Sequence, residues 1–134
     1  MSWSMNVPAG FGVVTPYIFA DDAGTYLEFL IAAFDGEELG RSVMPNGRIA
    51  NAQIRFSGTT LMVSEASPQF PASRAAFYLY VDDADVAMAR ALGCGATRIM
   101  DVGDMPYGDR QGGVADPCGN IWWISQRLTK APYF

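Results

Sequence analysis

A short segment occurs twice in this chain, and the repeat constrains the fold more than any other feature. Residues 17–23 read Tyr-Ile-Phe-Ala-Asp-Asp-Ala, and residues 78–84 read Tyr-Leu-Tyr-Val-Asp-Asp-Ala. Each copy predicts a strand that leads into a helix, because an Asp before a helix accepts hydrogen bonds from the free amides of the first turn. A repeated unit of this kind indicates a duplicated architecture. We therefore expect two equivalent modules that bury their faces against a shared feature.

The residues after each copy predict the same order of elements, a strand, a helix and three more strands. In the first half we expect strands at 13–20, 38–44, 49–56 and 60–65. The first helix should begin after Asp21 or Asp22 and end at Asp35-Gly36, and its apolar face should comprise Tyr26, Leu27, Leu30, Ile31 and Phe34. In the second half we expect strands at 75–81, 96–102, 111–115 and 121–127, with a helix over 86–92 after Asp82 or Asp83.

The predicted fold class is therefore α+β, with two tandem βαβββ modules. A single domain over 13–128 would contain module one (13–66), a linker (67–73) and module two (74–128). The linker is indicated by Pro68 and Pro71. Residues 1–12 would form an N-terminal extension, and residues 129–134 would form a C-terminal tail.

Composition excludes several classes of function. The net charge of −5 over 134 residues argues against nucleic acid, which requires clustered Lys and Arg. The longest apolar run, 29–34, is far too short to span a membrane. Residues 1–6 have neither a basic start nor an apolar run, so they do not resemble a signal peptide. We expect a cytoplasmic protein without nucleic-acid or membrane partners.

The chain contains no histidine, which removes the commonest general base and the commonest metal ligand from consideration. Cys94 and Cys118 lack the spacing of a metal site. Free thiols in a reducing compartment are the simpler interpretation, and a disulfide between them is left open by the sequence.

Alternation along the predicted strands defines a candidate binding face. Ala50, Ala52, Ile54 and Phe56 would pack under a helix, which places Asn51, Gln53 and Arg55 on the opposite side of the same strand. Neighbouring strands would add further side chains to such second faces, namely Thr15, Tyr17 and Phe19, then Ala76, Tyr78 and Tyr80, then Trp123, Ser125 and Arg127. These faces predict a concave surface of aromatic rings and amides, because polar side chains are costly in a core. Alternatively, the aromatic residues fill the interior or form a dimer contact.

The run from Tyr107 to Trp122, YGDRQGGVADPCGNIW, resembles the vicinal oxygen chelate superfamily. This superfamily includes glyoxalase I, bleomycin-resistance proteins and extradiol dioxygenases, and the run is most similar to its PhnB-like branch. The opening Val14-Thr15-Pro16-Tyr17 agrees with this resemblance, which covers about residues 12–128. It implies a glyoxalase-like domain whose two βαβββ modules form curved sheets around a cleft, usually in a dimer.

The resemblance also implies where a metal would be held in the enzymes of this superfamily. The ligand positions correspond to Thr15, Ala76 and Trp123, with Val63 or Ser64 beside Glu65 as the fourth. Many PhnB-like relatives carry His at the position of Asn51. None of these positions supplies imidazole and at most one supplies a carboxylate, so no metal or other cofactor is expected.

We therefore expect a metal-free protein that binds a small, partly aromatic or polar molecule. The predicted ligand-binding residues are Thr15, Tyr17, Phe19, Asn51, Gln53, Arg55, Tyr78, Tyr80 and Trp123. The alternative is an enzyme of the lyase, isomerase or dioxygenase type with an atypical or weak metal site, in which Glu65, Tyr78 and Tyr80 would be the acid or base groups. No spacing pairs a nucleophile with a base, so catalytic residues are not assigned. A third alternative is a scaffold with a vestigial cleft.

A homodimer is expected because each module would leave sheet edges and apolar surface for a partner to cover. The dimer could form by exchanging modules at the linker around Pro68–Pro71, and the sequence does not decide this.

The loop that contains Tyr107, Asp109 and Arg110 either shapes one end of the cleft through an Asp–Arg pair or is a structural loop.

Overall fold

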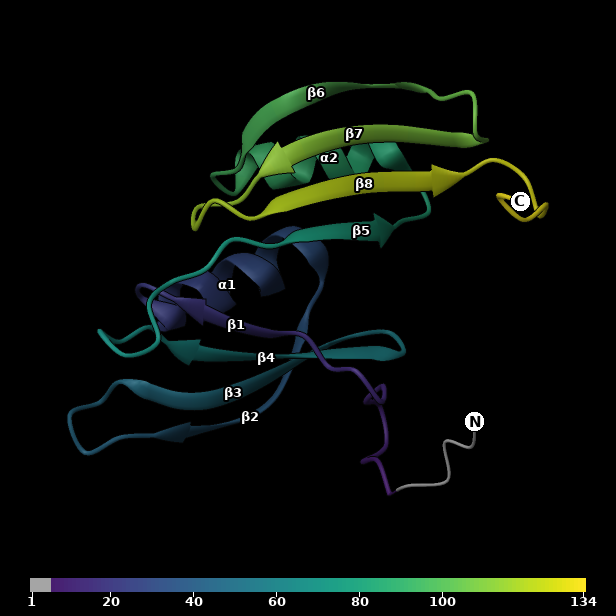
Figure 1. Cartoon of the computed structure of the whole chain (residues 1–134). Helices are drawn as coiled ribbons and strands as arrows, with labels where there is room; N and C mark the ends of the chain where they lie inside the picture. The colour runs from purple at the N-terminus through teal and green to yellow at the C-terminus, as the bar shows by residue number, and fades with distance from the viewer. Residues whose placement is uncertain (1–5) are drawn as a thin grey trace. The chain divides into compact units, whose positions relative to one another are not determined.

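A computed structural model describes residues 6–134 of the chain (Figure 1). The predictions for the N-terminal extension and for the absence of a signal peptide fall partly outside these residues, since 1–5 are not described. The chain divides into two compact units, Met1–Ser73 and Arg74–Phe134. Within residues 6–134 each unit holds one four-stranded sheet and one helix, so the fold is α+β with two βαβββ modules.

The first module contains β1 (Tyr17–Ala20), α1 (Ala23–Phe34), β2 (Glu37–Val43), β3 (Ile49–Phe56) and β4 (Thr59–Glu65). Its strands are ordered β1-β4-β3-β2, with β1 parallel to β4 and the other pairs antiparallel. The helix buries Leu27 and Leu30 completely, against a sheet face that includes Ile54 and Val63. Alternation of apolar residues along β3 and β4 supplies that face.

The second module repeats this order with β5 (Ala76–Tyr80), α2 (Ala84–Gly93), β6 (Thr97–Asp104), β7 (Asp109–Ala115) and β8 (Ile121–Arg127). Its sheet order, β5-β8-β7-β6, matches that of the first module position by position. Met88 and Ala91 of α2 are buried, together with Val114, Trp122 and Ile124 of the sheet. Helix α2 therefore covers one face of this sheet (Figure 1).

The two repeated Asp pairs start the helices as the sequence predicts. The Asp22 carboxylate accepts hydrogen bonds from the Thr25 amide at 3.3 Å and the Thr25 hydroxyl at 2.8 Å. The Asp83 carboxylate accepts from the Val86 amide at 3.1 Å. In each pair the second Asp is the N-cap, which resolves the choice left open by the sequence.

Three details of the first module differ from the prediction. The first strand begins at Tyr17 rather than at Val13, and Val14 is almost fully exposed before it. Proline cannot donate to a ladder, so Pro16 marks a natural start for pairing, and only its carbonyl is bonded, to the Met62 amide. Ala50 is exposed because the β2–β3 register shifts beside it and places Ile49 on the helix side.

The third detail concerns the apolar face of α1. Ile31 is 40% exposed, whereas Phe29 is 5% exposed and packs edge-on against Phe34. The buried stripe is centred between Leu27 and Leu30, so Ile31 lies at its margin.

Neither helix of the described chain is long and apolar enough to cross a membrane.

Candidate functional site

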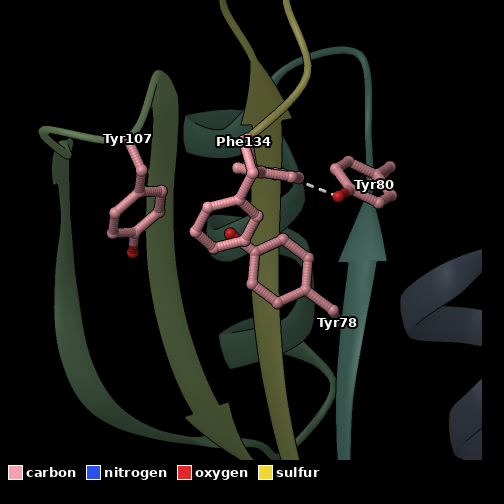
Figure 2. Close-up of a pocket in the computed structure, with 5 residues that line it drawn as sticks. Tyr78, Tyr80, Tyr107 and Phe134 are labelled. Carbon is pink, nitrogen blue, oxygen red and sulfur yellow. Dashed lines mark hydrogen bonds between the residues drawn. The ribbon is translucent and has the colours of Figure 1, made fainter.

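A cavity of about 450 Å³ lies over the second sheet, and five aromatic side chains line it. Tyr78 and Tyr80 project from β5, Tyr107 from the turn between β6 and β7, and Tyr133 and Phe134 from the C-terminal segment. Figure 2 shows these rings gathered on one face of the sheet, with the helix on its other side. We call this group the tyrosine cavity.

Strand geometry accounts for the orientation of the β5 tyrosines. Tyr78 and Tyr80 alternate with Phe77 and Leu79, and Phe77 stacks on Trp122 of the core with ring centroids 4.5 Å apart. The two tyrosines therefore point away from α2. In the ladder Tyr78 lies beside Trp123 of β8.

Trp123 shares this face but does not line the cavity, because its indole lies across β7 at Gly113. A Cβ atom on Gly113 would lie 2.6 Å from the Trp123 ring. Gly113 is therefore required for the indole to lie flat against its neighbouring strand.

A buried carboxylate holds the cavity walls together. Asp109 is 0% exposed, and its carboxylate accepts hydrogen bonds from the Tyr78 hydroxyl, from the Tyr133 hydroxyl at 2.7 Å and from Arg127 Nη1 at 2.9 Å. Two of the five lining residues are thus fixed by one buried charge. An ionised carboxylate is stable in such a place only when it is paired and hydrogen-bonded.

The pKa directions agree with this geometry. Burial alone would raise the pKa of Asp109, but the hydrogen bonds from Tyr78, Tyr133 and Arg127 outweigh it, so the pKa is lowered from its ordinary value of 3.8. Burial, followed by the hydrogen bond to Asp109, raises the pKa of Tyr78. Burial, followed by the hydrogen bonds to Tyr80 and Asp109, also raises the pKa of Tyr133. At neutral pH the phenols keep their protons and Asp109 is ionised.

The C-terminal segment is fastened to the sheet by Arg127. Its Nη2 donates to the Ala131 carbonyl at 2.6 Å, and its guanidinium lies 3.9 Å from the centre of the Tyr133 ring. The Leu128 amide donates to the Gly108 carbonyl at 2.9 Å. The segment predicted as a tail is therefore ordered against the second module and forms part of the cavity.

A second polar chain borders the cavity on the side of β7. The Tyr107 hydroxyl donates to Gln111 Oε1, and Gln111 Nε2 donates to the Ser125 hydroxyl at 2.7 Å. Gln111 is 4% exposed and Ser125 is 0% exposed, so this chain is buried in the sheet face. It anchors Tyr107, which is itself 44% exposed.

The corresponding face of the first module carries a different network. The Tyr17 hydroxyl is hydrogen-bonded to the Ser64 hydroxyl and accepts from Asn51 Nδ2 at 3.2 Å. Gln53 Nε2 donates to Asn51 Oδ1 at 3.4 Å. The predicted amide and aromatic side chains therefore do share one face of this sheet.

Other predicted residues of the first module have separate partners. Arg55 forms an ion pair with Glu37 at 3.2 Å, and the Thr15 hydroxyl donates to the Gly12 carbonyl at 3.0 Å. Phe19 stacks between Tyr17 and Phe70, at centroid distances of 5.0 and 5.6 Å.

The nine predicted site residues thus divide between the two units. Thr15, Tyr17, Phe19, Asn51, Gln53 and Arg55 belong to the first, and Tyr78, Tyr80 and Trp123 to the second. Their assignment to one shared cleft stays a prediction.

The sequence did not predict several contacts and residues of the tyrosine cavity. Asp109 and Arg110 do not pair with each other. Asp109 forms an ion pair with Arg127, and Arg110 forms ion pairs with Asp85 at 2.8 Å and with Asp104 at 3.0 Å. Alternation with Trp123 had already placed Arg127 on this face. No signal in the sequence identified Tyr133 and Phe134, because nothing predicted that the C-terminal segment folds back.

The positions implied for a divalent metal do not fit one. Thr15 and Ala76 offer no carboxylate, thiolate or imidazole, and Trp123 offers none. The Glu65 carboxylate instead accepts from the Asp22 and Ala23 amides at 2.8 and 3.2 Å, at the start of α1. Nowhere within residues 6–134 do three His, Cys, Asp or Glu side chains gather as a metal site.

The Asp-Pro-x-Gly-Asn turn has a structural role. The Asp116 carboxylate accepts from the Cys118 and Asn120 amides, both at 2.9 Å, and from the Trp122 indole at 2.8 Å. Asn120 Oδ1 accepts from the Ala75 amide at 2.8 Å, next to the start of β5. The turn thereby aligns the strand that carries Tyr78. Cys94 and Cys118 are both half-buried.

Comparison with known proteins agrees with this architecture. A family model described as a glyoxalase-like domain matches residues 18–124. An uncharacterised protein of Mycobacterium bovis is 35% identical over 124 residues, which cover 84% of this chain and 82% of the relative.

Two solved structures show the same fold. A glyoxalase/bleomycin resistance protein from Streptomyces sp. CB03234 is 25% identical, with a TM-score of 0.63 over 82% of this chain and 96% of that chain. A PhnB protein from Bacillus cereus, described as a putative 3-demethylubiquinone-9 3-methyltransferase, is 17% identical, with a TM-score of 0.64 over 86% of this chain and 99% of that chain.

Proposed function

This chain belongs to the family of glyoxalase-like domains, and from this premise we propose that it binds a small organic molecule without a metal ion. The observation that carries the proposal is the tyrosine cavity. Concave, largely aromatic surfaces with a few fixed polar groups are the usual form of a small-molecule site.

The size and lining of the cavity favour a flat, partly aromatic ligand. A volume of about 450 Å³ lies within the range of small-molecule pockets, roughly 300–1,000 Å³. Tyrosine rings offer a large contact area at low cost in conformational entropy, and an aromatic contact adds about 0.5–1.5 kcal/mol beyond burial. The contacts of Asp109 hold two of the rings before a ligand arrives, which limits the ordering cost of binding.

The duplicated fold offers a matched test of this proposal. Tyr80 and Phe19 occupy corresponding places in the two copies of the repeat, and only Tyr80 lines the cavity. We would titrate the protein with 2-naphthol and follow binding by ligand-observed NMR. Tyr80→Leu should weaken binding by about 3- to 10-fold, the size of one lost aromatic contact, whereas Phe19→Leu should leave binding unchanged.

Two results would count against the proposal, the first against small-molecule binding and the second against the tyrosine cavity as its site. One is an absence of 2-naphthol binding to the wild-type protein at millimolar concentration. The other is binding that is lost in Phe19→Leu and kept in Tyr80→Leu, which would move the site to the first module.

The proposed binder is expected to be a homodimer. Strands β2 and β6 lie at the edges of their own sheets, and such edges leave unpaired backbone groups that a partner can cover. Light scattering after size-exclusion chromatography should give about twice the chain mass of 14.5 kDa. A single-chain mass at micromolar concentration would contradict this expectation.

A further inference from the structure

The phenolic protons of the tyrosine cavity are all donated to acceptors within the protein. Tyr78 donates to Asp109, and Tyr107 donates to Gln111. Tyr133 donates to Asp109 at 2.7 Å, so the 2.7 Å contact between Tyr80 and Tyr133 has Tyr80 as its donor. A ligand in the cavity therefore meets no free phenolic O–H group.

What remains for a ligand is electron-rich surface. Phenol oxygens keep lone pairs, and the faces of aromatic rings carry the negative part of their quadrupole. Tyr78 and Tyr133 also donate to an ionised carboxylate, a charge-assisted bond that moves electron density toward their rings. An anion or a neutral acceptor finds no matching proton on these tyrosines, whereas a cation finds favourable ring faces.

The protein already places one cation on this surface. The Arg127 guanidinium lies 3.9 Å from the centre of the Tyr133 ring, within cation–π range. Its charge is balanced by Asp109 at 2.9 Å, and two further N–H groups donate to the Tyr107 and Ala131 carbonyls. Because this pair is neutral as a whole, it leaves the ring faces to set the preference of the cavity.

We propose that the tyrosine cavity selects an organic cation, an alkylated ammonium group attached to an aromatic ring. This inference rests on the proposed small-molecule function and specifies its ligand class. The ring of such a ligand stacks on the tyrosines, and its ammonium group lies against their faces. Aromatic side chains recognise quaternary ammonium groups elsewhere in the same way.

Three probes of similar shape test the charge preference. Phenyltrimethylammonium carries the cation, tert-butylbenzene is its neutral isostere, and benzenesulfonate carries an anion. Titration would be followed by NMR of the tyrosine ring resonances at about 0.3 M NaCl, where general attraction to a chain of net charge −5 is largely screened. The cation should bind about 3- to 30-fold more tightly than the neutral isostere, and the anion should bind most weakly.

Substitutions at Tyr80 locate the preference. Tyr80→Phe keeps the ring and should keep the preference for the cation, whereas Tyr80→Leu should reduce it by about 3-fold or more. Tyr80 is 55% exposed, so neither change should unfold the protein, and a thermal melt of each variant checks this. Val86→Ala is the control, because Val86 is 63% exposed on α2 and does not line the cavity, and it should bind all three probes as the wild type does.

The possible results distinguish a failure of the cation preference from a failure of small-molecule binding itself. If the neutral isostere binds as tightly as the cation, the cation preference is wrong and small-molecule binding stands. If none of the three probes binds, the proposed function and the inference both fail. A cation preference that is unchanged in Tyr80→Leu would also overturn the inference.

Discussion

The two modules share one scaffold and differ most on the sheet face that points away from the helix. In both, a side chain from the last strand reaches the start of the helix, where Glu65 accepts from the Ala23 amide and Gln126 from the Ala84 amide. On the opposite face, Tyr17 bonds to a neutral serine, whereas Tyr78 bonds to the buried Asp109. Duplication therefore preserved the helix side of each sheet, while the other faces diverged.

A buried carboxylate accounts for the difference between the two faces. A charge buried under the second sheet face attracts hydroxyl and guanidinium donors, which draws in Tyr78, Tyr133 and Arg127. In the first module the Tyr17 hydroxyl has neutral partners instead, namely Ser64 and the Asn51 amide at 3.2 Å. One carboxylate thus distinguishes the face that carries an aromatic cavity from the face whose tyrosine has neutral partners.

Removal of that carboxylate should have the largest effect. Asp109→Ala leaves the donors of Tyr78, Tyr133 and Arg127 without their acceptor and should destabilise the protein by about 3 kcal/mol. Ser64→Ala, which removes the neutral partner in the first module, should cost only about 1 kcal/mol. Urea denaturation measures both changes, and equal losses would contradict the asymmetry of the two faces.

A glycine of the second module should show the next effect. Gly113→Ala places a Cβ atom 2.6 Å from the Trp123 ring and should cost about 2 kcal/mol through overpacking. Gly103→Ala is the control in the same sheet, because a Cβ atom there meets nothing within 4 Å. The comparison uses thermal melting. Equal melting temperatures for the two variants would show that Trp123 moves aside at little cost.

Substitution of Glu65 and Gln126, whose side chains accept hydrogen bonds from the first amides of the helices, should have a smaller effect. Glu65→Gln should lose about 0.5–1 kcal/mol, because a carboxylate at a helix N-terminus is favoured over an amide. Gln126→Glu should raise the free energy of unfolding by a similar amount. Gln126 is the equivalent of Glu65 in the second module, and Asp83 is the equivalent of Asp22. Chemical denaturation of both variants tests the equivalence of the two sites. A loss of stability in Gln126→Glu would refute it.

The smallest effect at ordinary pH concerns the titration of Asp109. Its pKa is lower in the folded state than the ordinary value of 3.8, so its stabilising contribution is present above that value. The contribution is lost as the pH falls through the lowered pKa. The wild type should therefore lose more stability than Asp109→Asn between about pH 5 and pH 2. Parallel pH profiles would mean that Asp109 is not ionised in the folded protein.

The sequence predicted local structure well where the chain signals its own boundaries. The strands at 49–56 and 121–127 begin and end as expected, and the Asp pairs mark both helices. The prediction failed at Ala50, because a register shift depends on the neighbouring strand. It failed at Ile31 because the burial of a residue at the margin of an apolar stripe depends on how the helix is rotated against its sheet.

The repeat, the composition and the alternation of apolar residues were sufficient to establish two βαβββ modules and the direction of Tyr17, Tyr78 and Tyr80. These properties are local, since they depend on hydrogen bonding and side-chain periodicity within short segments. Only the tertiary structure paired Asp109 with Arg127 and returned Tyr133 to the sheet. Those contacts join segments that are separate in the chain, and a buried charge selects its partners by proximity in space rather than by spacing in sequence.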